Sequence, residues 1–143
     1  MPGIDFRKRF AEMVKSGSKT QTIRKKRTPP IKTGDHLTLW TGMRTKQCEP
    51  LGDATCTKVL PVKIRLGYKD IWLWDESSEY PDSDGEIVGN FYQLNQEQAE
   101  DFVKADGFNN QDEFFEFFKN VPPDVLQDLM VVIYWRQGWD FKK

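Results

Sequence analysis

The chain has 143 residues, of which 38% are hydrophobic and 13% aromatic, a composition that excludes intrinsic disorder and suffices for one real core. No apolar run approaches the roughly 20 residues that cross a membrane, and the N-terminus lacks the hydrophobic region of a signal peptide. We therefore expect a single domain spanning residues 1–143 that is cytoplasmic and makes no membrane contact. The two cysteines, Cys48 and Cys56, are expected to be reduced thiols.

Charge is unevenly divided along the chain although the net charge is only −1. The first 46 residues hold twelve Lys or Arg and three Asp or Glu, a net charge of +9, and the remainder carries −10. Such a division favours a basic face for an anionic partner such as RNA and an acidic face that keeps the protein in solution. The alternative is that the two oppositely charged parts simply attract each other.

Hydrophobic spacing predicts the elements of the first third of the chain. Ile4–Gly17 has the pattern of an amphipathic helix that ends at a glycine. The β-branched segment Lys19–Arg24 is expected to be extended, and Lys25–Thr33 is a basic loop interrupted by two prolines. A turn at Gly34-Asp35 precedes a strand at Leu37–Trp40.

The middle of the chain predicts strands separated by loops. After a loop over Thr41–Leu51, Asp53–Leu66 alternates apolar and polar residues as a long, half-buried strand does, with a bend expected at Pro61. Ile71–Trp74 is expected to be another short strand. Asp75–Gly89 is acidic and rich in turn residues, which is typical of a mobile loop.

The last third predicts two helices and a closing strand. The helices cover Asn95–Ala105 and Asn110–Lys119, Pro122-Pro123 ends the second, and Leu129–Trp135 is a buried strand. Together these elements indicate an α+β fold in which helices flank a small mixed β-barrel of about five or six strands. The barrel strands are expected around Thr22, Leu39, Thr57, Val62 and Val132.

The sequence offers little for metal or standard cofactor chemistry. His36 is the one histidine, and the two cysteines have no second pair at zinc-binding spacing. Phosphate-binding loops, dinucleotide-binding glycine motifs and serine-hydrolase elbows are missing from the sequence. We expect neither a metal nor a cofactor.

One cluster, Gly17–Arg24, has residues suited to nucleophilic catalysis. On a strand, Thr20, Thr22 and Arg24 would share one face, and Lys19 at the junction before it is free to fold onto that face. A lysine removed from water has a lowered pKa and can take a proton from a threonine hydroxyl. The alternative is a solvated lysine beside a threonine-rich strand.

The same cluster, Gly-Ser-Lys-Thr-Gln-Thr-Ile-Arg, resembles the G-x-K-T-x-T-x-R signature of the ASCH domain. Lys32–Leu37 is similar to the K-x-G-D-x-L turn and strand of that family. Further similar segments follow in the same order and spacing over nearly the whole chain. They are Thr41–Arg44, Leu51-Gly52 up to Cys56, Ala105–Phe108, Asp112–Phe114 and the last strand with Trp135.

This resemblance implies a PUA-like β-barrel whose cleft accepts RNA or a modified nucleoside. One branch of the family removes the acetyl group from N4-acetylcytidine with a threonine nucleophile, a lysine and a glutamate. Those roles fall on Thr22, on Lys19 and, in place of the glutamate, on Asp106, with Glu100 as a weaker substitute for the acid. The chain also departs from the family by an insertion over roughly Tyr68–Gly89.

The resemblance, the division of charge and the aromatic residues together suggest a set of residues that bind substrate or RNA. Arg24 and backbone amides near Thr41-Gly42 are expected to stabilise the oxyanion, while a salt bridge to the acidic half is the other role open to Arg24. The full expected set is Thr20, Arg24, Arg27, Trp40, Thr41, Gly42, Arg44 and Lys46.

Two further functions compete with the amidohydrolase. A non-catalytic RNA-binding module would use the basic segment for phosphates and Trp40, Trp72 and Trp74 for base stacking, unless these tryptophans belong to the core. A ribonuclease would use the same basic cleft. We expect six basic residues to border that cleft, or else to pair with the acidic residues 75–86. The six are Arg24, Lys25, Lys26, Arg27, Arg44 and Lys46.

Overall fold

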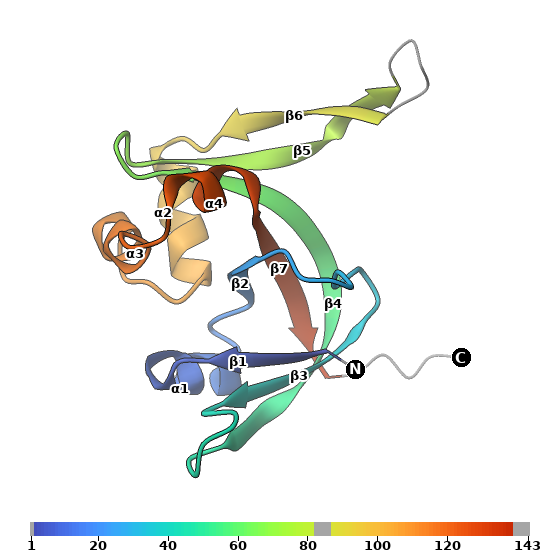
Figure 1. The fold of residues 1–143 in the computed structure, drawn as a ribbon, viewed down its shortest axis with the longest axis vertical. Coiled ribbons are helices and arrows are strands. Elements are labelled where there is room, and N and C mark those ends of the chain that lie inside the picture. Colours follow the sequence, from blue (N-terminus) through green and yellow to red (C-terminus); the bar gives the residue numbers. More distant parts are fainter. Residues whose placement is uncertain (1, 82–86, 139–143) are drawn as a thin grey trace.

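The computed structural model describes residues 2–81 and 87–138, which form a mixed seven-stranded sheet and four helices, an α+β fold (Figure 1). The strands are β1 (Gly3–Phe6), β2 (Gln21–Lys25), β3 (His36–Thr41), β4 (Glu49–Arg65), β5 (Asp70–Pro81), β6 (Ile87–Gln93) and β7 (Met130–Gln137). The helices are α1 (Lys8–Ser16), α2 (Gln96–Ala105), α3 (Gln111–Phe117) and α4 (Pro123–Asp128). None of the described helices is long and apolar enough to cross a membrane.

The long, curved strand β4 is the spine of the sheet (Figure 1). It pairs with β7 over Ala54–Val62, with β3 near its start and with β5 near its end, always antiparallel. On the far side of β7 lies β2, β6 pairs with β5, and β1 runs parallel to β3. The strands expected around Thr22, Leu39, Thr57, Val62 and Val132 all form, with Thr57 and Val62 on the same strand.

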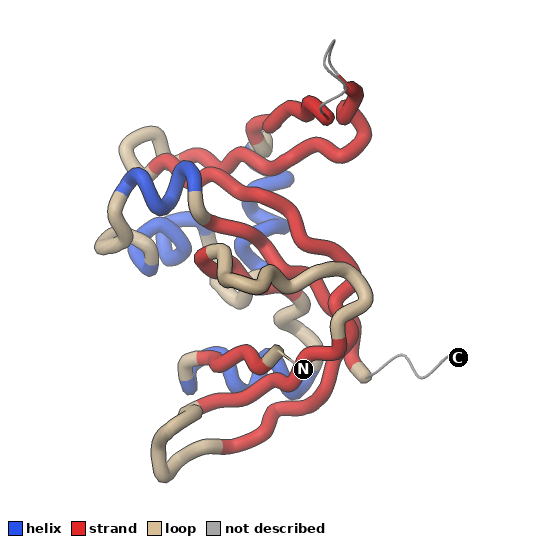
Figure 2. Tube along the Cα trace, turned by 45° about the vertical axis from the view of Figure 1, so that its right-hand side comes forward, coloured by secondary structure: helices blue, strands red, loops and turns tan. Residues whose placement is uncertain are grey.

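The expected closed barrel does not form. Within the described residues β1, β2 and β6 each pair with one strand only, so the sheet keeps open edges. The reason lies in β4, which spans 17 residues and carries the β3–β1 pair and the β5–β6 pair at opposite ends. These two pairs diverge instead of meeting, as the turned view shows (Figure 2).

The N-terminal helix begins later than its hydrophobic pattern predicts. Ile4 and Phe6 belong to β1, where they are buried on either side of the exposed Asp5. This alternation has the period of a strand, and it merges in sequence with the helical pattern of α1. Gly17 ends α1 as expected, with a left-handed φ of 84° and its N–H donated to the Val14 carbonyl.

Two predicted loops contain strand instead. β4 already starts at Glu49, inside the loop expected over Thr41–Leu51, and β5 and β6 occupy most of the loop expected over Asp75–Gly89. Residues 82–86 of that segment lie outside the described residues. The helix α4 was not expected, because Pro122-Pro123 was interpreted only as a break, whereas proline is well tolerated in the first turn of a helix.

Aromatic side chains connect the helices on either side of the candidate site. Phe114 of α3 packs edge-on against Phe108, which follows α2, with ring centroids 5.3 Å apart. Phe108 in turn packs against Phe10 of α1 at 5.4 Å. The loop after α2 is thereby fixed opposite α1 and the start of β2.

Candidate active site

Lys19 and Thr22 are brought together by the turn between α1 and β2. After Gly17 the chain reverses, and the Lys19 N–H donates to the Met13 carbonyl. The Lys19 side chain enters the protein and is only 2% exposed, while Thr22 on β2 is 4% exposed. The solvated lysine that the sequence left open is therefore excluded.

Asp106 approaches from the opposite side, at the end of α2. Its backbone N–H caps the helix by donating to Phe102, and the residue is 3% exposed. Lys19 Nζ donates to the Asp106 carbonyl oxygen at 2.5 Å and lies 3.6 Å from Asp106 Oδ1. Among the described residues this buried Oδ1 accepts no hydrogen bond, and the Lys19 ammonium group is its ion-pair partner.

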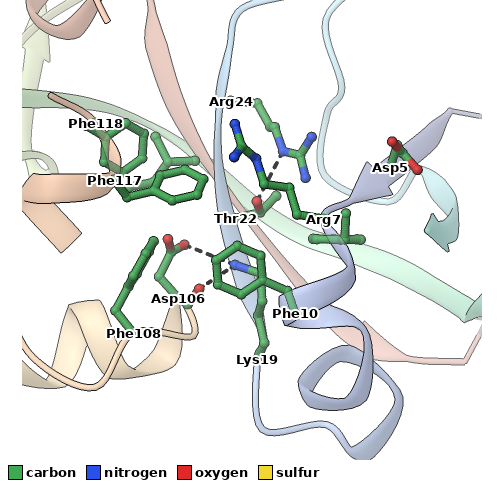
Figure 3. A pocket seen from close by; sticks show the side chains of 12 residues that line it. Asp5, Arg7, Phe10, Lys19, Thr22, Arg24, Asp106, Phe108, Phe117 and Phe118 are labelled. Carbon is green, nitrogen blue, oxygen red and sulfur yellow. Dashed lines mark hydrogen bonds and ion pairs between the residues drawn. The ribbon is translucent and has the colours of Figure 1, made fainter. Parts of the chain in front are cut away.

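These three side chains line one cavity of about 230 Å³ (Figure 3). Phenylalanines form much of its wall, and Figure 3 shows Asp106 and Lys19 at one end with Thr22 beyond them. The wall phenylalanines are Phe6, Phe10, Phe108, Phe117 and Phe118. The cavity thus combines flat apolar walls with a few polar groups, as small-molecule sites do.

Arg24 holds the threonine hydroxyl. Its Nε donates to Thr22 Oγ1 at 3.1 Å, and its guanidinium lies over the Phe6 ring at 5.0 Å. Two residues apart on one strand, Thr22 and Arg24 share a face, as the sequence predicts. Thr20 does not join them, because it precedes β2 and is exposed.

Burial shifts the pKa values of the acid and the base in opposite directions. Loss of water lowers the pKa of Lys19 to about 8, with Asp106 opposing this change and Arg24 adding to it. Loss of water likewise raises the pKa of Asp106 to about 6, opposed by Lys19. A neutral lysine beside an ionised aspartate is therefore accessible at mildly alkaline pH.

In the present geometry Lys19 is directed at Asp106 instead of Thr22. Among the described residues no hydrogen bond joins Lys19 Nζ to Thr22 Oγ1, and the hydroxyl contacts Arg24. Proton transfer between them would require a rotamer change of Lys19 within the cavity. Substrate binding commonly tightens such contacts in hydrolases.

Thr41 and Gly42 lie in a different place from the one expected. They line a neighbouring cavity of about 830 Å³, on the other side of Asp5, Phe6 and Arg7. The Thr41 hydroxyl donates to the Phe6 carbonyl at 2.7 Å, a structural role. The prediction that their backbone amides serve the oxyanion is therefore not supported by the geometry.

The basic residues divide between two surfaces. Arg24, Lys25, Lys26 and Arg27 line one hollow beside β7, and Arg27 also donates to the Gly3 carbonyl. The exposed Arg44 and Lys46 lie on the β3–β4 loop and line neither this hollow nor the site cavity. A single cleft bordered by all six is not what the structure shows.

The tryptophans proposed for stacking are half-buried parts of the sheet. Trp40 lies on β3 opposite Asp5, and Trp74 packs edge-on against Phe91 at 5.2 Å. Trp72 lies under the Arg65 guanidinium at 5.4 Å. None of the three lines the site cavity. In residues 2–81 and 87–138, no three His, Cys, Asp or Glu side chains gather as metal ligands would.

Sequence reasoning missed several residues of the cavity. Arg7 was assigned to the outer face of a helix that was expected to begin too early, but it lies between β1 and α1 and lines the site. Phe10, Phe117 and Phe118 fall on the predicted helices, where nothing in the sequence indicated that they line a site. Phe108 lies in a segment that resembles the ASCH family, which was the available signal for a role beyond packing.

Gly107 packs against Phe10 and Lys19, two residues that line the cavity, and we predict that Gly107→Ala destabilises the fold. Its φ is 101°, and an added Cβ would lie 2.9 Å from Phe10 and 3.2 Å from the Lys19 side chain. The left-handed backbone costs about 1 kcal/mol for alanine, and overpacking adds about 1–3 kcal/mol. Chemical denaturation of the variant measures this loss.

The matched control is Gly34→Ala. Gly34 has a similar φ of 92° but nothing within 4 Å of the added Cβ. It should lose only the backbone contribution to the free energy of unfolding. Equal losses in the two variants would contradict the close packing of Gly107 against the site.

Comparisons of the chain with protein-family models, with curated proteins and with solved structures gave no significant match.

Proposed function

We propose that this protein is an ASCH-type hydrolase with an opened PUA-like sheet that removes the acetyl group from N4-acetylcytidine. The observation that carries the proposal is the meeting of Lys19, Thr22 and Asp106 in one cavity. Lys19 lies just before β2, Thr22 lies on β2, and Asp106 is the residue after α2, 87 positions from Lys19. They are nevertheless the three residues that the family resemblance selects. A nucleophile, a base and an acid that converge in a cavity are the elements of acyl transfer.

The walls of the cavity suit a single acylated base. A volume of about 230 Å³ lies just below the range of drug-sized ligands, which favours one base with its acetyl group over a length of RNA. Phe10, Phe108 and Phe117 offer ring surfaces, and unstacked bases bind readily against aromatic side chains. Asp106 lines the cavity, and we assign to its Oδ1, which accepts no hydrogen bond from a described residue, the role of acceptor for the exocyclic N–H of the base.

The proposed reaction has two stages. Neutral Lys19 takes the Thr22 hydroxyl proton as Oγ1 attacks the acetyl carbonyl, and Arg24 stabilises the resulting oxyanion. The C–N bond then breaks, Lys19 returns the proton to the exocyclic nitrogen, and cytidine leaves. Water, deprotonated by Lys19, next attacks the acetyl-threonine ester. The ester C–O bond breaks, Lys19 returns the proton to Thr22 Oγ1, and acetic acid leaves and ionises to acetate. Asp106 orients Lys19 and the exocyclic nitrogen throughout.

The direct test incubates the protein with N4-acetylcytidine and follows cytidine and acetate by chromatography. We expect stoichiometric formation of both products. A protein with Thr20→Val is the control, because Thr20 is exposed and outside the cavity, and it should keep full activity. A wild-type protein that forms no cytidine would contradict the enzymatic proposal.

A second candidate function, RNA binding without catalysis, is favoured by the four consecutive basic residues that line one hollow. In a parallel incubation with labelled RNA, retention without cleavage would support this module, and cleavage would support a ribonuclease. Each phosphate contact with single-stranded RNA contributes about −0.7 to the slope of log affinity against log salt.

We therefore predict that binding of a labelled RNA weakens steeply with salt, and that replacing Lys25, Lys26 and Arg27 by alanine makes the slope shallower by about 2. The matched variant replaces Arg44 and Lys46, which lie on another loop, and should change the slope less per residue. Filter binding at several salt concentrations measures both. A salt-independent affinity would argue against the basic surface as an RNA site.

A further inference from the structure

Two arginines face the cavity next to Thr22 without a carboxylate partner. Arg7 and Arg24 both line the cavity, and in Figure 3 their guanidinium groups point to its Thr22 side. Arg7 lies over the Phe117 ring at 4.9 Å, and Arg24 gives one N–H to Thr22. Neither forms an ion pair within residues 2–81 and 87–138.

Two carboxylates in the cavity wall, Asp106 and Asp5, act on Arg24 through space, but neither forms an ion pair with it. Asp5 also lines the cavity, but its Oδ1 accepts the Met43 N–H at 3.0 Å, and it forms no ion pair with a described residue. Arg24 is half-buried and Arg7 is exposed, and among the described residues no acceptor takes a terminal N–H of either guanidinium group. Planar donors of this kind match phosphate oxygens, so the pair is suited to an anion.

The start of α1 adds to this positive potential. Arg7 is the N-cap residue of α1, and in the described structure no side chain caps this end and no acidic residue stands in its first turn. Uncapped amides at a helix N-terminus carry a partial positive charge that favours phosphate. Arg7 itself lines the site cavity, whereas Lys8, the first residue of α1, lines the neighbouring one, so the helix end contributes a general positive potential and the arginine pair forms the contact.

We propose that Arg7 and Arg24 form a phosphate subsite at the mouth of the cavity, so that a cytidine nucleotide binds more tightly than the neutral nucleoside. This inference deepens the proposed function and rests on it for the identity of the base. The cavity holds the base, and the sugar phosphate extends outward to the two guanidinium groups. The phosphate belongs either to a mononucleotide or to an RNA strand.

Binding measurements without turnover test the subsite. Calorimetric titrations compare cytidine, cytidine 5′-monophosphate and a short cytidine oligonucleotide on wild-type protein and on Arg7→Ala. We expect the monophosphate to bind wild-type protein about tenfold more tightly than cytidine, and Arg7→Ala to lose most of this ratio. Lys8→Ala, which removes a neighbouring charge outside the cavity, should keep the ratio.

The possible results of these titrations either support or contradict the phosphate subsite. Equal affinities for cytidine and its monophosphate on wild-type protein, or an unchanged ratio in Arg7→Ala, would overturn the subsite. If the oligonucleotide binds more tightly than the monophosphate, the phosphate in the subsite belongs to RNA. If the monophosphate binds more tightly, it belongs to a mononucleotide. Arg7→Lys should restore part of the ratio, because it returns the charge without the planar fork.

The subsite and the proposed reaction can fail separately. Suppose that the protein does not deacetylate N4-acetylcytidine but binds the monophosphate more tightly than cytidine, and that Arg7→Ala removes this difference. The phosphate subsite is then supported and the proposed reaction is contradicted. If the protein deacetylates the nucleoside with no preference for a phosphate, the reaction stands and the subsite falls.

Discussion

Thr22→Ala and Lys19→Ala are each expected to lower the rate of N4-acetylcytidine deacetylation by at least about a thousandfold. The first removes the atom that attacks the acetyl group, and the second removes the base that takes its proton. Because these residues act as a unit, the double variant should lose little more than either single one. Chromatographic assay of cytidine measures the rate.

The controls separate chemistry from folding. Thr22→Ser keeps a hydroxyl on the same atom and should retain measurable activity, while circular dichroism and thermal unfolding check that each variant keeps its structure. Lys19 is fully buried, so Lys19→Met, which fills the same space without the amine, guards against a cavity effect. A Thr22→Ala protein with full activity would leave N4-acetylcytidine as the substrate but would contradict the proposed threonine mechanism.

Asp106 belongs to the same series. Asp106→Ala should lower the rate less than loss of the nucleophile, because the carboxylate acts through Lys19 and the exocyclic nitrogen. The 3.6 Å distance between Asp106 Oδ1 and Lys19 Nζ is longer than a hydrogen bond, and the longer side chain of a glutamate would shorten it. We therefore expect Asp106→Glu to raise the rate.

Most strands were predictable because apolar and polar residues alternate along them, as expected for strands with one buried face. Ile4 and Phe6 show the limit: two apolar residues two apart cannot separate a short strand from the start of a helix when a real helix follows. The acidic residues after Trp74 favoured a loop in the prediction, whereas the structure has the β5–β6 hairpin there. Its pairing of β5 with β6 depends on backbone bonds that turn-rich composition does not reveal.

The candidate site was predictable only in part. Lys19, Thr22 and Asp106 were selected by a resemblance to known sequences, and the structure adds that they share one cavity. Arg7 and the phenylalanine walls were not found, since side chains that converge across 100 residues leave no local pattern. The failure of the barrel has a similar cause, because closure depends on how far β4 carries its two strand pairs apart.

The pH dependence of the reaction is the second large effect. Burial lowers the pKa of Lys19 to about 8, so the amine is protonated and inactive as a base below that pH. The rate should therefore fall about tenfold per pH unit below about 8. Burial raises the pKa of Asp106 to about 6, so below pH 6 the carboxylate also becomes protonated and the fall steepens. Profiles of kcat/KM against pH measure both limbs.

Asp106→Asn tests the assignment of these limbs. The Asp106 carboxylate raises the pKa of Lys19, so its removal should lower that pKa further and move the upper limb to lower pH. The steeper fall below pH 6 should disappear in the same variant, because no acid remains to titrate there. Thr20→Val should leave the profile unchanged. If the fall of kcat/KM near pH 8 stays at the same pH in Asp106→Asn, the carboxylate does not influence the pKa of Lys19. Asp106 would then have no role in the proposed mechanism.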